Sequence, residues 1–246
     1  MLDESYLCID IGTSSIKVLE KNAFGKVLSW GILERPSKSF HSSIRPIDAE
    51  DAAGALTNLL SCMGVSTQSA VMSLPSFYVF TVIADVVDPK FIPANPATYR
   101  LEATQLDDGR YFIVAIPKEV SEKYEAIADL CALRLVRLEL ESSAIAHRFQ
   151  NDLGRKLVVD IGSRSTTFSV VRNGSVEYVF HSDFGGASQA LDGVPYIKSY
   201  VWDVIMNKTR EIAEKQKIEQ ALFSNSVFNI ANGLQKISSQ AFNGHS

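Results

Sequence analysis

The first eighty residues alternate short apolar runs with turn residues and end in one amphipathic segment. Residues 6–11 form a mostly apolar run, and residues 15–33 predict two further strands joined by a turn. Between residues 48 and 64 the apolar positions recur at helical spacing, after an acidic first turn and before a glycine. A short strand is expected at 68–75. This part of the chain therefore predicts a β-meander, a helix and one more strand.

The middle of the chain predicts a small α/β insertion. Residues 88–98 contain three prolines and are expected to be irregular. Residues 110–117 then predict a strand, residues 118–133 an amphipathic helix, and residues 133–140 an alternating strand. A helix is expected over 141–154, where the chain leaves the insertion.

The pattern of the opening then repeats. A buried strand, Asp-Ile-Gly, hydroxyl residues and two further strands recur from residue 156 onward. The matching residues stand 150 positions apart, and they are Asp10 with Asp160, Gly12 with Gly162, and Ser15 with Ser165. Since one hairpin unit cannot bury its own apolar face, two copies predict a duplicated fold. After Gly193 we expect one long helix over 201–223 and a weak final helix after Asn229.

Composition and charge narrow the class of protein. The chain has 246 residues, of which 46% are hydrophobic and 21% charged, as in an ordinary globular protein. A formal net charge of −4 disfavours a nucleic-acid partner, which usually requires a basic patch. Three widely spaced cysteines indicate free thiols in a reducing compartment. The acidic start is unlike a signal peptide, and no apolar run reaches the ~20 residues needed to span a bilayer. We therefore expect a cytoplasmic protein that reaches any membrane through a partner.

The repeated hairpins carry residues suited to binding phosphate. A glycine at the apex lets backbone N–H groups approach anionic oxygens, and hydroxyl and lysine side chains add donors. A carboxylate at the end of the preceding strand can hold Mg²⁺ through water. The first loop would use Thr13, Ser14, Ser15 and Lys17, with Asp10 at the metal; the second would use Ser163, Ser165 and Thr166, with Asp160 at the metal. Ordinary turn chemistry explains one such copy equally well, but two copies favour a pair of phosphate loops that face each other across a cleft.

The paired hairpins, followed by Gly185 and Gly186, resemble the phosphate loops of the actin, Hsp70 and sugar-kinase superfamily. Within it, IDIGTSSIKVLE and SAVMSLPSFYVFTVIADV are similar to segments of the PilM and FtsA branch. So is YFIVAIPKEVSEKYEAIADLCALRLVRLELESSAIAHRF, and the resemblance extends over residues ~6 to 190. It implies an α/β fold, an actin-like ATPase with a ribonuclease-H-like core, duplicated β-hairpin phosphate loops and a small inserted α/β subdomain. The implied parts are a first subdomain (1–84), the insertion (85–140), a return helix (141–154) and a truncated second subdomain with a helical C-terminus (155–246).

The same resemblance implies a function. PilM-type proteins are cytoplasmic parts of a type IV pilus assembly machine that bind ATP with Mg²⁺. They also hold the cytoplasmic tail of PilN, an inner-membrane protein, in a groove between the first and inserted subdomains. By this resemblance the chain is a scaffold peripheral to the inner membrane, with at most slow ATPase activity, and its nucleotide contacts include Gly12, Gly162, Gly185 and Gly186.

Two features of the chain differ from this family. The insertion passes through VVDPKFIPANP where PilM proteins usually carry a helix. Only ~50 residues follow Gly193, and FNIANGLQKI at 228–237 resembles the glycine-rich turn under adenine only faintly. Without an adenosine pocket the loops would bind nucleotide weakly. The alternatives are therefore a degenerate scaffold that binds no nucleotide or, less favoured, a small-molecule kinase, for which no acid is singled out as a general base.

Overall fold

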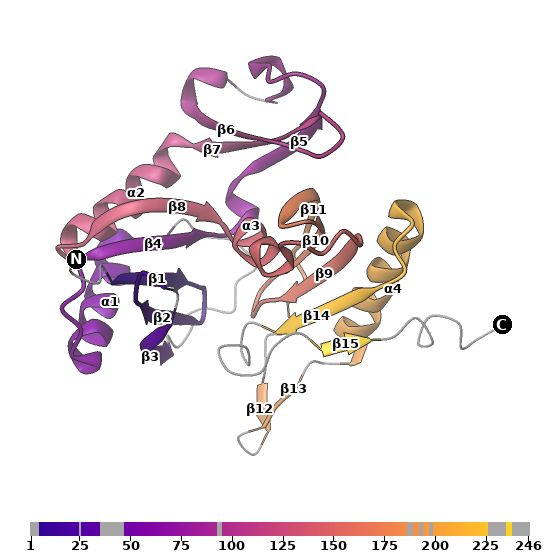
Figure 1. Ribbon diagram of the computed structural model, residues 1–246. Coiled ribbons are helices and arrows are strands. Elements are labelled where there is room, and N and C mark those ends of the chain that lie inside the picture. Colours follow the sequence, from indigo (N-terminus) through magenta and orange to yellow (C-terminus); the bar gives the residue numbers. More distant parts are fainter. Residues whose placement is uncertain are drawn as a thin grey trace. The chain divides into compact units, whose positions relative to one another are not determined.

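The computed structural model divides the chain into two compact units (Figure 1). Unit 1 comprises Met1–Phe80, Pro89–Glu102 and Val114–Glu141. Unit 2 comprises Thr81–Asp88, Ala103–Ile113 and Ser142–Ser246. Within them, the residues that the structure describes are 5–24, 26–34, 47–92, 95–185, 189–191, 194–196, 199–225 and 235–237.

Unit 1 is built on a five-stranded sheet with the order β3-β2-β1-β4-β8. The first three strands form the predicted antiparallel meander, and β4 and β8 are parallel to β1 and to each other. The bounds are β1 (Tyr6–Ile11), β2 (Ser15–Lys21), β3 (Val27–Glu34), β4 (Ser69–Leu74) and β8 (Arg134–Leu140). In β1 and the start of β2 buried and half-buried residues alternate, which is the period of a strand with one face toward a core.

The helix α1 (Ala49–Met63) begins and ends where the sequence predicts. The Asp48 side chain accepts a hydrogen bond from the backbone N–H of Asp51, and Gly64 ends the helix in the left-handed conformation with φ of 66°. Leu56 and Leu59 lie on its buried face. The neighbouring helix α2 (Lys118–Leu130) buries Tyr124 and Ile127.

Unit 2 repeats this strand order in a second five-stranded sheet, β11-β10-β9-β14-β15. The bounds are β9 (Lys156–Ile161), β10 (Thr166–Arg172), β11 (Ser175–Ser182), β14 (Ala221–Asn225) and β15 (Gln235–Ile237). As α1 precedes β4, so α4 (Ser199–Gln216) precedes β14, and β14 is parallel to β9. The fifth strands differ, because β15 runs antiparallel to its neighbour whereas β8 runs parallel. The predicted duplication is therefore confirmed over four strands and one helix.

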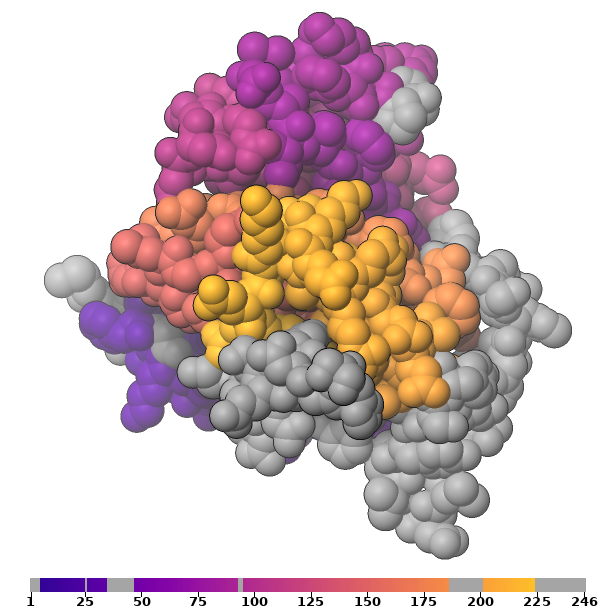
Figure 2. All heavy atoms as spheres, turned by 90° about the vertical axis from the view of Figure 1, so that its right-hand side faces the viewer, coloured from indigo at the N-terminus to yellow at the C-terminus, as the bar shows by residue number. Residues whose placement is uncertain are grey.

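The core of unit 2 forms between its sheet and α4. Phe168 and Val170 of β10 pack with Ile205 and Ile212 of α4. The other side of α4 lies at the surface, where its orange to yellow atoms are visible in Figure 2.

The predicted helix over 201–223 is too long. The helix α4 ends at Gln216, Lys217 adopts a positive φ of 53°, and residues 221–225 form β14. Ala221, Leu222 and Phe223 are buried beside β9, so the free energy of burying a central strand overrides the helical pattern. The predicted final helix is also wrong where it can be compared, since residues 235–237 form β15; its remaining residues lie outside the described part of the chain.

Two other regions agree with the sequence more closely. The helix expected over 141–154 is present but short, as α3 (Glu141–Ala146) followed by the 3₁₀ turn η4 (His147–Phe149). The proline-rich region is irregular as expected, with the 3₁₀ turns η2 (Pro89–Phe91) and η3 (Pro96–Thr98).

The remaining elements are a 3₁₀ turn and two small sheets. The turn η1 (Ser76–Tyr78) follows β4, and a three-stranded sheet has the order β5-β7-β6. Its strands are β5 (Phe80–Ala84), β6 (Tyr99–Gln105) and β7 (Tyr111–Pro117). The strands β12 (Gln189–Leu191) and β13 (Val194–Tyr196) form an antiparallel pair. No helix in the described part of the chain is long and apolar enough to cross a membrane.

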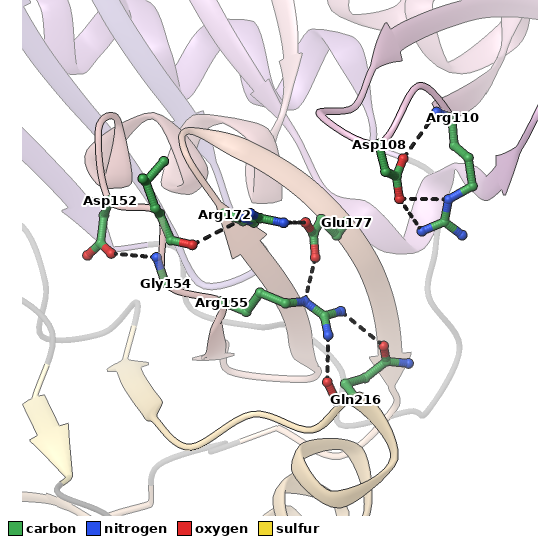
Figure 3. A network of polar contacts seen from close by, with 9 residues as sticks. Asp108, Arg110, Asp152, Gly154, Arg155, Arg172, Glu177 and Gln216 are labelled. Atoms are coloured by element: carbon green, nitrogen blue, oxygen red, sulfur yellow. Dashed lines mark hydrogen bonds and ion pairs between the residues drawn. The ribbon is translucent and has the colours of Figure 1, made fainter.

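A polar network ties the start of β9 to the end of α4 within unit 2 (Figure 3). The Arg155 guanidinium donates to the Glu177 carboxylate at 2.6 Å and to the Gln216 carbonyl oxygen at 2.6 Å. Arg172 lies 4.0 Å from the same carboxylate and donates to the Leu153 carbonyl oxygen. The last turn of α4 therefore has one of its otherwise unpaired carbonyl groups satisfied by a cation.

Candidate functional site

The first hairpin turns between β1 and β2 around Gly12. Its backbone N–H donates to the carbonyl oxygen of Ser15 at 2.9 Å. A Cβ at Gly12 would lie 3.1 Å from the same oxygen, so the turn leaves little room for a side chain there. Thr13 is exposed, and Ser14 and Ser15 are half-buried. The loop therefore presents hydroxyl groups, and Gly12 occupies a position where a side chain would crowd the Ser15 carbonyl oxygen.

The second hairpin has the same backbone bond. The Gly162 N–H donates to the Ser165 carbonyl oxygen at 2.8 Å, and Asp160 lies opposite Thr167 as Asp10 lies opposite Lys17. Ser163 and Ser165 are half-buried. The residues that repeat in the sequence thus occupy matching positions in two matching hairpins.

Asp10 is held by two side chains. Lys17 Nζ lies 3.0 Å from Asp10 Oδ2, and the Ser73 hydroxyl donates to Asp10 Oδ1 at 2.7 Å. The Lys17 side chain is 14% exposed and that of Asp10 is 31% exposed. Lys17, which the sequence suggests as a phosphate donor, therefore points to the aspartate at the base of its own hairpin.

Ser73 is a site residue that sequence reasoning missed. It lies near the end of β4, next to Asp10 of β1, and its counterpart in unit 2 is Ser224, which lies opposite Asp160 in the β14–β9 register. The signal in the sequence is a serine at the end of each short apolar run, Ser73 within VMSLP and Ser224 within FSNS, 151 positions apart. In both halves a serine therefore lies next to the duplicated aspartate on the neighbouring strand.

Asp160 belongs to a row of polar residues that lie opposite one another on the neighbouring strands β9, β10 and β11. It is 7% exposed, it faces Thr167 of β10, and Thr167 in turn faces His181 of β11. His181 Nε2 lies 3.7 Å from a carboxylate oxygen of Asp183. Burial lowers the pKa of His181 below the ordinary value of 6.5, and the charge of Asp183 opposes that shift in part. His181 is therefore expected to be neutral at neutral pH.

The segment after β11 lies against the second hairpin. The Thr166 hydroxyl, wholly buried, donates to the Phe184 carbonyl oxygen at 2.6 Å. A Cβ at Gly185 would overlap the backbone of Arg164 and Ser165. Gly185 therefore allows close approach of two backbone segments, and Thr166 holds the second of them in place. Gly186 lies outside the described residues.

Arg164 is a second residue that sequence reasoning missed. It lies between Ser163 and Ser165 at the tip of the second hairpin and is half-buried. A guanidinium presents several donors in a fixed plane and suits phosphate oxygens. The basic residue within GSRS was visible in the sequence and could have been included.

The carboxylates of the two hairpins suit a Mg²⁺ ion that is bound beside phosphate better than one that is held by protein ligands alone. Within the described residues no three His, Cys, Asp or Glu side chains gather as a metal cluster. Magnesium beside phosphates usually keeps several waters and needs only one or two carboxylates. Asp10 accepts one bond on each oxygen and remains partly exposed, so its carboxylate has further acceptor capacity. Asp10 belongs to unit 1 and Asp160 to unit 2.

Comparison with known proteins identifies the fold. No family model matches the chain, and no curated protein matches it in sequence. Among solved structures, the PilM-PilN type IV pilus biogenesis complex matches with a TM-score of 0.63 and 15% identity, over 90% of this chain and 81% of that one. The ethanolamine utilization protein EutJ from Carboxydothermus hydrogenoformans matches with a TM-score of 0.55 and 13% identity, over 91% and 77% of the two chains.

Two further structures agree. A Bacteroides thetaiotaomicron protein, described as having an actin-like ATPase fold and unknown function, matches with a TM-score of 0.55 and 8% identity, over 91% and 82% of the two chains. The cytoplasmic domain of EpsL, an inner-membrane component of the type II secretion system of Vibrio cholerae, matches with a TM-score of 0.51 and 11% identity, over 73% and 71%. The chain has the actin-like ATPase fold.

Proposed function

We propose that this chain, with its actin-like fold, is a nucleotide-binding scaffold of a type IV pilus assembly complex at the inner membrane. The observation that carries the proposal is the pair of matching hairpins, each closed by a Gly N–H to Ser carbonyl bond and each preceded by an aspartate. Ordinary turn chemistry explains one such loop, but it gives no reason for two with the same register and the same neighbouring serine.

The proposed phosphate contacts come from both hairpins. Backbone N–H groups and hydroxyls would bind the phosphate oxygens, with Lys17 and Arg164 supplying positive charge. Because Lys17 Nζ is 3.0 Å from Asp10, phosphate would compete with that carboxylate for the ammonium group. The proposed contacts are Gly12, Thr13, Ser14, Ser15, Lys17, Gly162, Ser163, Ser165, Gly185 and Gly186. The buried hydroxyl of Thr166 donates to the Phe184 carbonyl oxygen, so Thr166 would support the second loop and would not bind phosphate with its hydroxyl.

Asp10 and Asp160 are proposed to hold Mg²⁺ through water. The metal would neutralise part of the phosphate charge when it is bound. Ser73 donates to Asp10 and would keep its carboxylate oriented. Among the described residues of the site no side chain stands out as a general base for an attacking water, and we propose a binding protein with at most slow ATPase activity.

The proposed partner is the short cytoplasmic tail of a PilN-like inner-membrane protein. Its support is the fold match to a PilM-PilN complex and to the cytoplasmic domain of an inner-membrane secretion protein. In this proposal residues 1–84 form the first subdomain, 141–154 the return helix and 155–246 the second subdomain. The insertion expected over 85–140 would end before β8 (Arg134–Leu140), because that strand pairs with β4 in the sheet of unit 1. The chain would be cytoplasmic and attached to the inner membrane through the partner, which binds between the first and inserted subdomains.

Calorimetric titration with ATP and Mg²⁺ tests the proposal. The chain is expected to bind in the micromolar range, and Asp10→Asn and Asp160→Asn are each expected to weaken binding about 10- to 100-fold. Asp107→Asn removes an exposed carboxylate in the turn before β7 and should leave the affinity unchanged. If the folded wild-type chain binds no nucleotide, the hairpins serve only the fold and the chain is a scaffold without a nucleotide.

A further inference from the structure

The Ser73 hydroxyl is bonded to a carboxylate that a third side chain also holds. It donates to Asp10 Oδ1 at 2.7 Å, and Lys17 Nζ lies 3.0 Å from Asp10 Oδ2. Enzymes activate a serine by placing its hydroxyl within hydrogen-bond reach of a base and by orienting that base with another group. Ser73, Asp10 and Lys17 are therefore arranged as nucleophile, base and orienting cation.

These three side chains share one face of the sheet of unit 1. Each is half-buried and stands between two buried residues of its own strand. Because side chains alternate between the two faces of a strand, all three point away from the core that those neighbours form. Lys17 lies opposite Asp10 in the β1–β2 register, and Ser73 follows the stretch in which β4 pairs with β1. The Ser73 hydroxyl thus lies on the same face as the cation that the proposed function assigns to phosphate.

We propose that Ser73 is a phosphorylation site that the chain modifies itself, with ATP bound at the hairpins as the donor. Ser73 Oγ forms a bond to the γ-phosphorus while its proton passes to Asp10 Oδ1 and later to solvent. The bond from the γ-phosphorus to the oxygen that bridges to the β-phosphate breaks, and ADP leaves with that electron pair. An aspartate accepts the proton of an attacking hydroxyl in the same way in protein kinases. This phosphorylation rests on the proposed function, because it needs ATP at the first hairpin.

The shared carboxylate explains why this hydroxyl would meet the donor phosphate. Ser73 and Lys17 are bonded to the two oxygens of Asp10, so a phosphate that binds the ammonium group approaches the carboxylate that holds the hydroxyl. Lys17 then leaves Oδ2 for the metal-bound water of the proposed site, while Oδ1 accepts the serine proton. The two oxygens of Asp10 thus have separate tasks.

Phosphoserine at this position would act back on nucleotide binding. It adds a charge of about −1.5 to −2 beside Asp10 and would compete with ATP for Lys17. The modified chain should therefore bind ATP at least about tenfold more weakly than the unmodified chain. The reaction would accordingly stop at one phosphoryl group per chain.

Mass spectrometry of the full chain incubated with ATP and Mg²⁺ tests the proposal. The intact mass should rise by one phosphoryl group, and fragmentation should place that group on Ser73. Ser73→Ala should abolish the modification, whereas Ser73→Thr keeps a hydroxyl and should restore it. Asp10→Asn should slow it at least about 100-fold, because the amide accepts no proton. Each variant is measured at an ATP concentration that saturates it in its own titration, so that weaker binding is not mistaken for slower transfer.

Ser29→Ala is the matched control. Ser29 also donates to a carboxylate, that of Glu20 at 2.9 Å, but the other oxygen of Glu20 accepts from the Thr67 hydroxyl and not from a cation. Its removal should leave the phosphorylation of Ser73 unchanged. The rate constant should also stay constant over about a tenfold range of protein concentration, since the transfer takes place within one chain.

Calorimetry separates failure of this proposal from failure of the proposed function. If the chain binds ATP but gains no phosphate, or gains it on another residue, Ser73 is not the acceptor and the nucleotide site still stands. Unchanged transfer in Asp10→Asn, or a rate that rises with protein concentration, would likewise overturn the proposal alone. If the folded chain binds no ATP, both are wrong. A phosphorylated chain that binds ATP as tightly as the unmodified chain would contradict the predicted competition for Lys17.

Discussion

At the residue scale, Asp10 is defined by the two groups that donate to it. Lys17 neutralises the carboxylate and Ser73 fixes its other oxygen at 2.7 Å. A ligand that brings phosphate and Mg²⁺ would draw the ammonium toward phosphate and the carboxylate toward the metal. In this structure the hairpin holds its two charged groups against each other.

The hydroxyl of Ser73 is expected to matter only when metal is present. Ser73→Ala should weaken the affinity for ATP with Mg²⁺ about tenfold, as for other groups that orient a metal-binding carboxylate, and leave the affinity for ATP in EDTA unchanged. Titration calorimetry in the two buffers measures both. The control is Ser29→Ala, which removes a similar bond, from Ser29 to the Glu20 carboxylate at 2.9 Å on β2. An equal loss in both buffers would show that Ser73 supports the fold and not the metal.

His181 predicts how stability depends on pH. Its pKa is lowered by burial, so the unfolded chain binds a proton more readily than the folded chain does. The free energy of unfolding should therefore fall as the pH drops below about 6.5, the ordinary histidine pKa. His181→Gln should remove part of this slope in urea melts between about pH 7 and pH 5. The exposed His147, changed to Gln, is the control; equal slopes in wild type and His181→Gln would refute the assignment.

At the element scale, replacing glycine by alanine should change the free energy of unfolding in opposite directions at two positions with different surroundings. Gly185→Ala should destabilise unit 2 by about 1–3 kcal/mol, because its Cβ would meet the backbone of Arg164 and Ser165, which cannot move aside like a side chain. Gly54→Ala, inside α1 with nothing within 4 Å, should raise stability by about 0.5–1 kcal/mol. Urea melts of the two variants measure both signs. A neutral Gly185→Ala would mean that the second hairpin and the segment after β11 are not tightly apposed.

Sequence reasoning succeeded where a pattern is local and failed where a contact is distant. The repeat at Asp10 and Asp160 could be seen because each motif is contiguous, and the two hairpins share one bond pattern. Ser73 could not, because its partner lies 63 residues away. The end of α4 was missed because an apolar run as short as β14 does not show by period alone whether it is a strand or a helix.

Lys17 shows another limit of sequence reasoning. The motif identifies a cation beside a phosphate loop but not the group to which that cation is bonded before a ligand arrives. The Asp10 carboxylate, seven residues earlier, lies opposite it only because β1 and β2 pair in that register. The position was predictable from the hairpin, and the ion pair was not.

At the scale of the whole molecule, the proposed nucleotide site needs residues from both halves of the chain. Two sheets with the same strand order each present one Gly-Ser hairpin and one aspartate, and the proposed function requires a single nucleotide to contact both. If the chain kept this fold but bound no nucleotide, ATP would affect neither hairpin.

Hydrogen exchange measured by mass spectrometry, with and without ATP and Mg²⁺, tests this claim most directly. The account predicts that ATP slows exchange in peptides covering residues 11–16 and in those covering 161–166, with loss of both effects in Asp10→Asn. Protection confined to one hairpin, or absent from both in a folded chain, would contradict the claim that the duplicated loops form one nucleotide site.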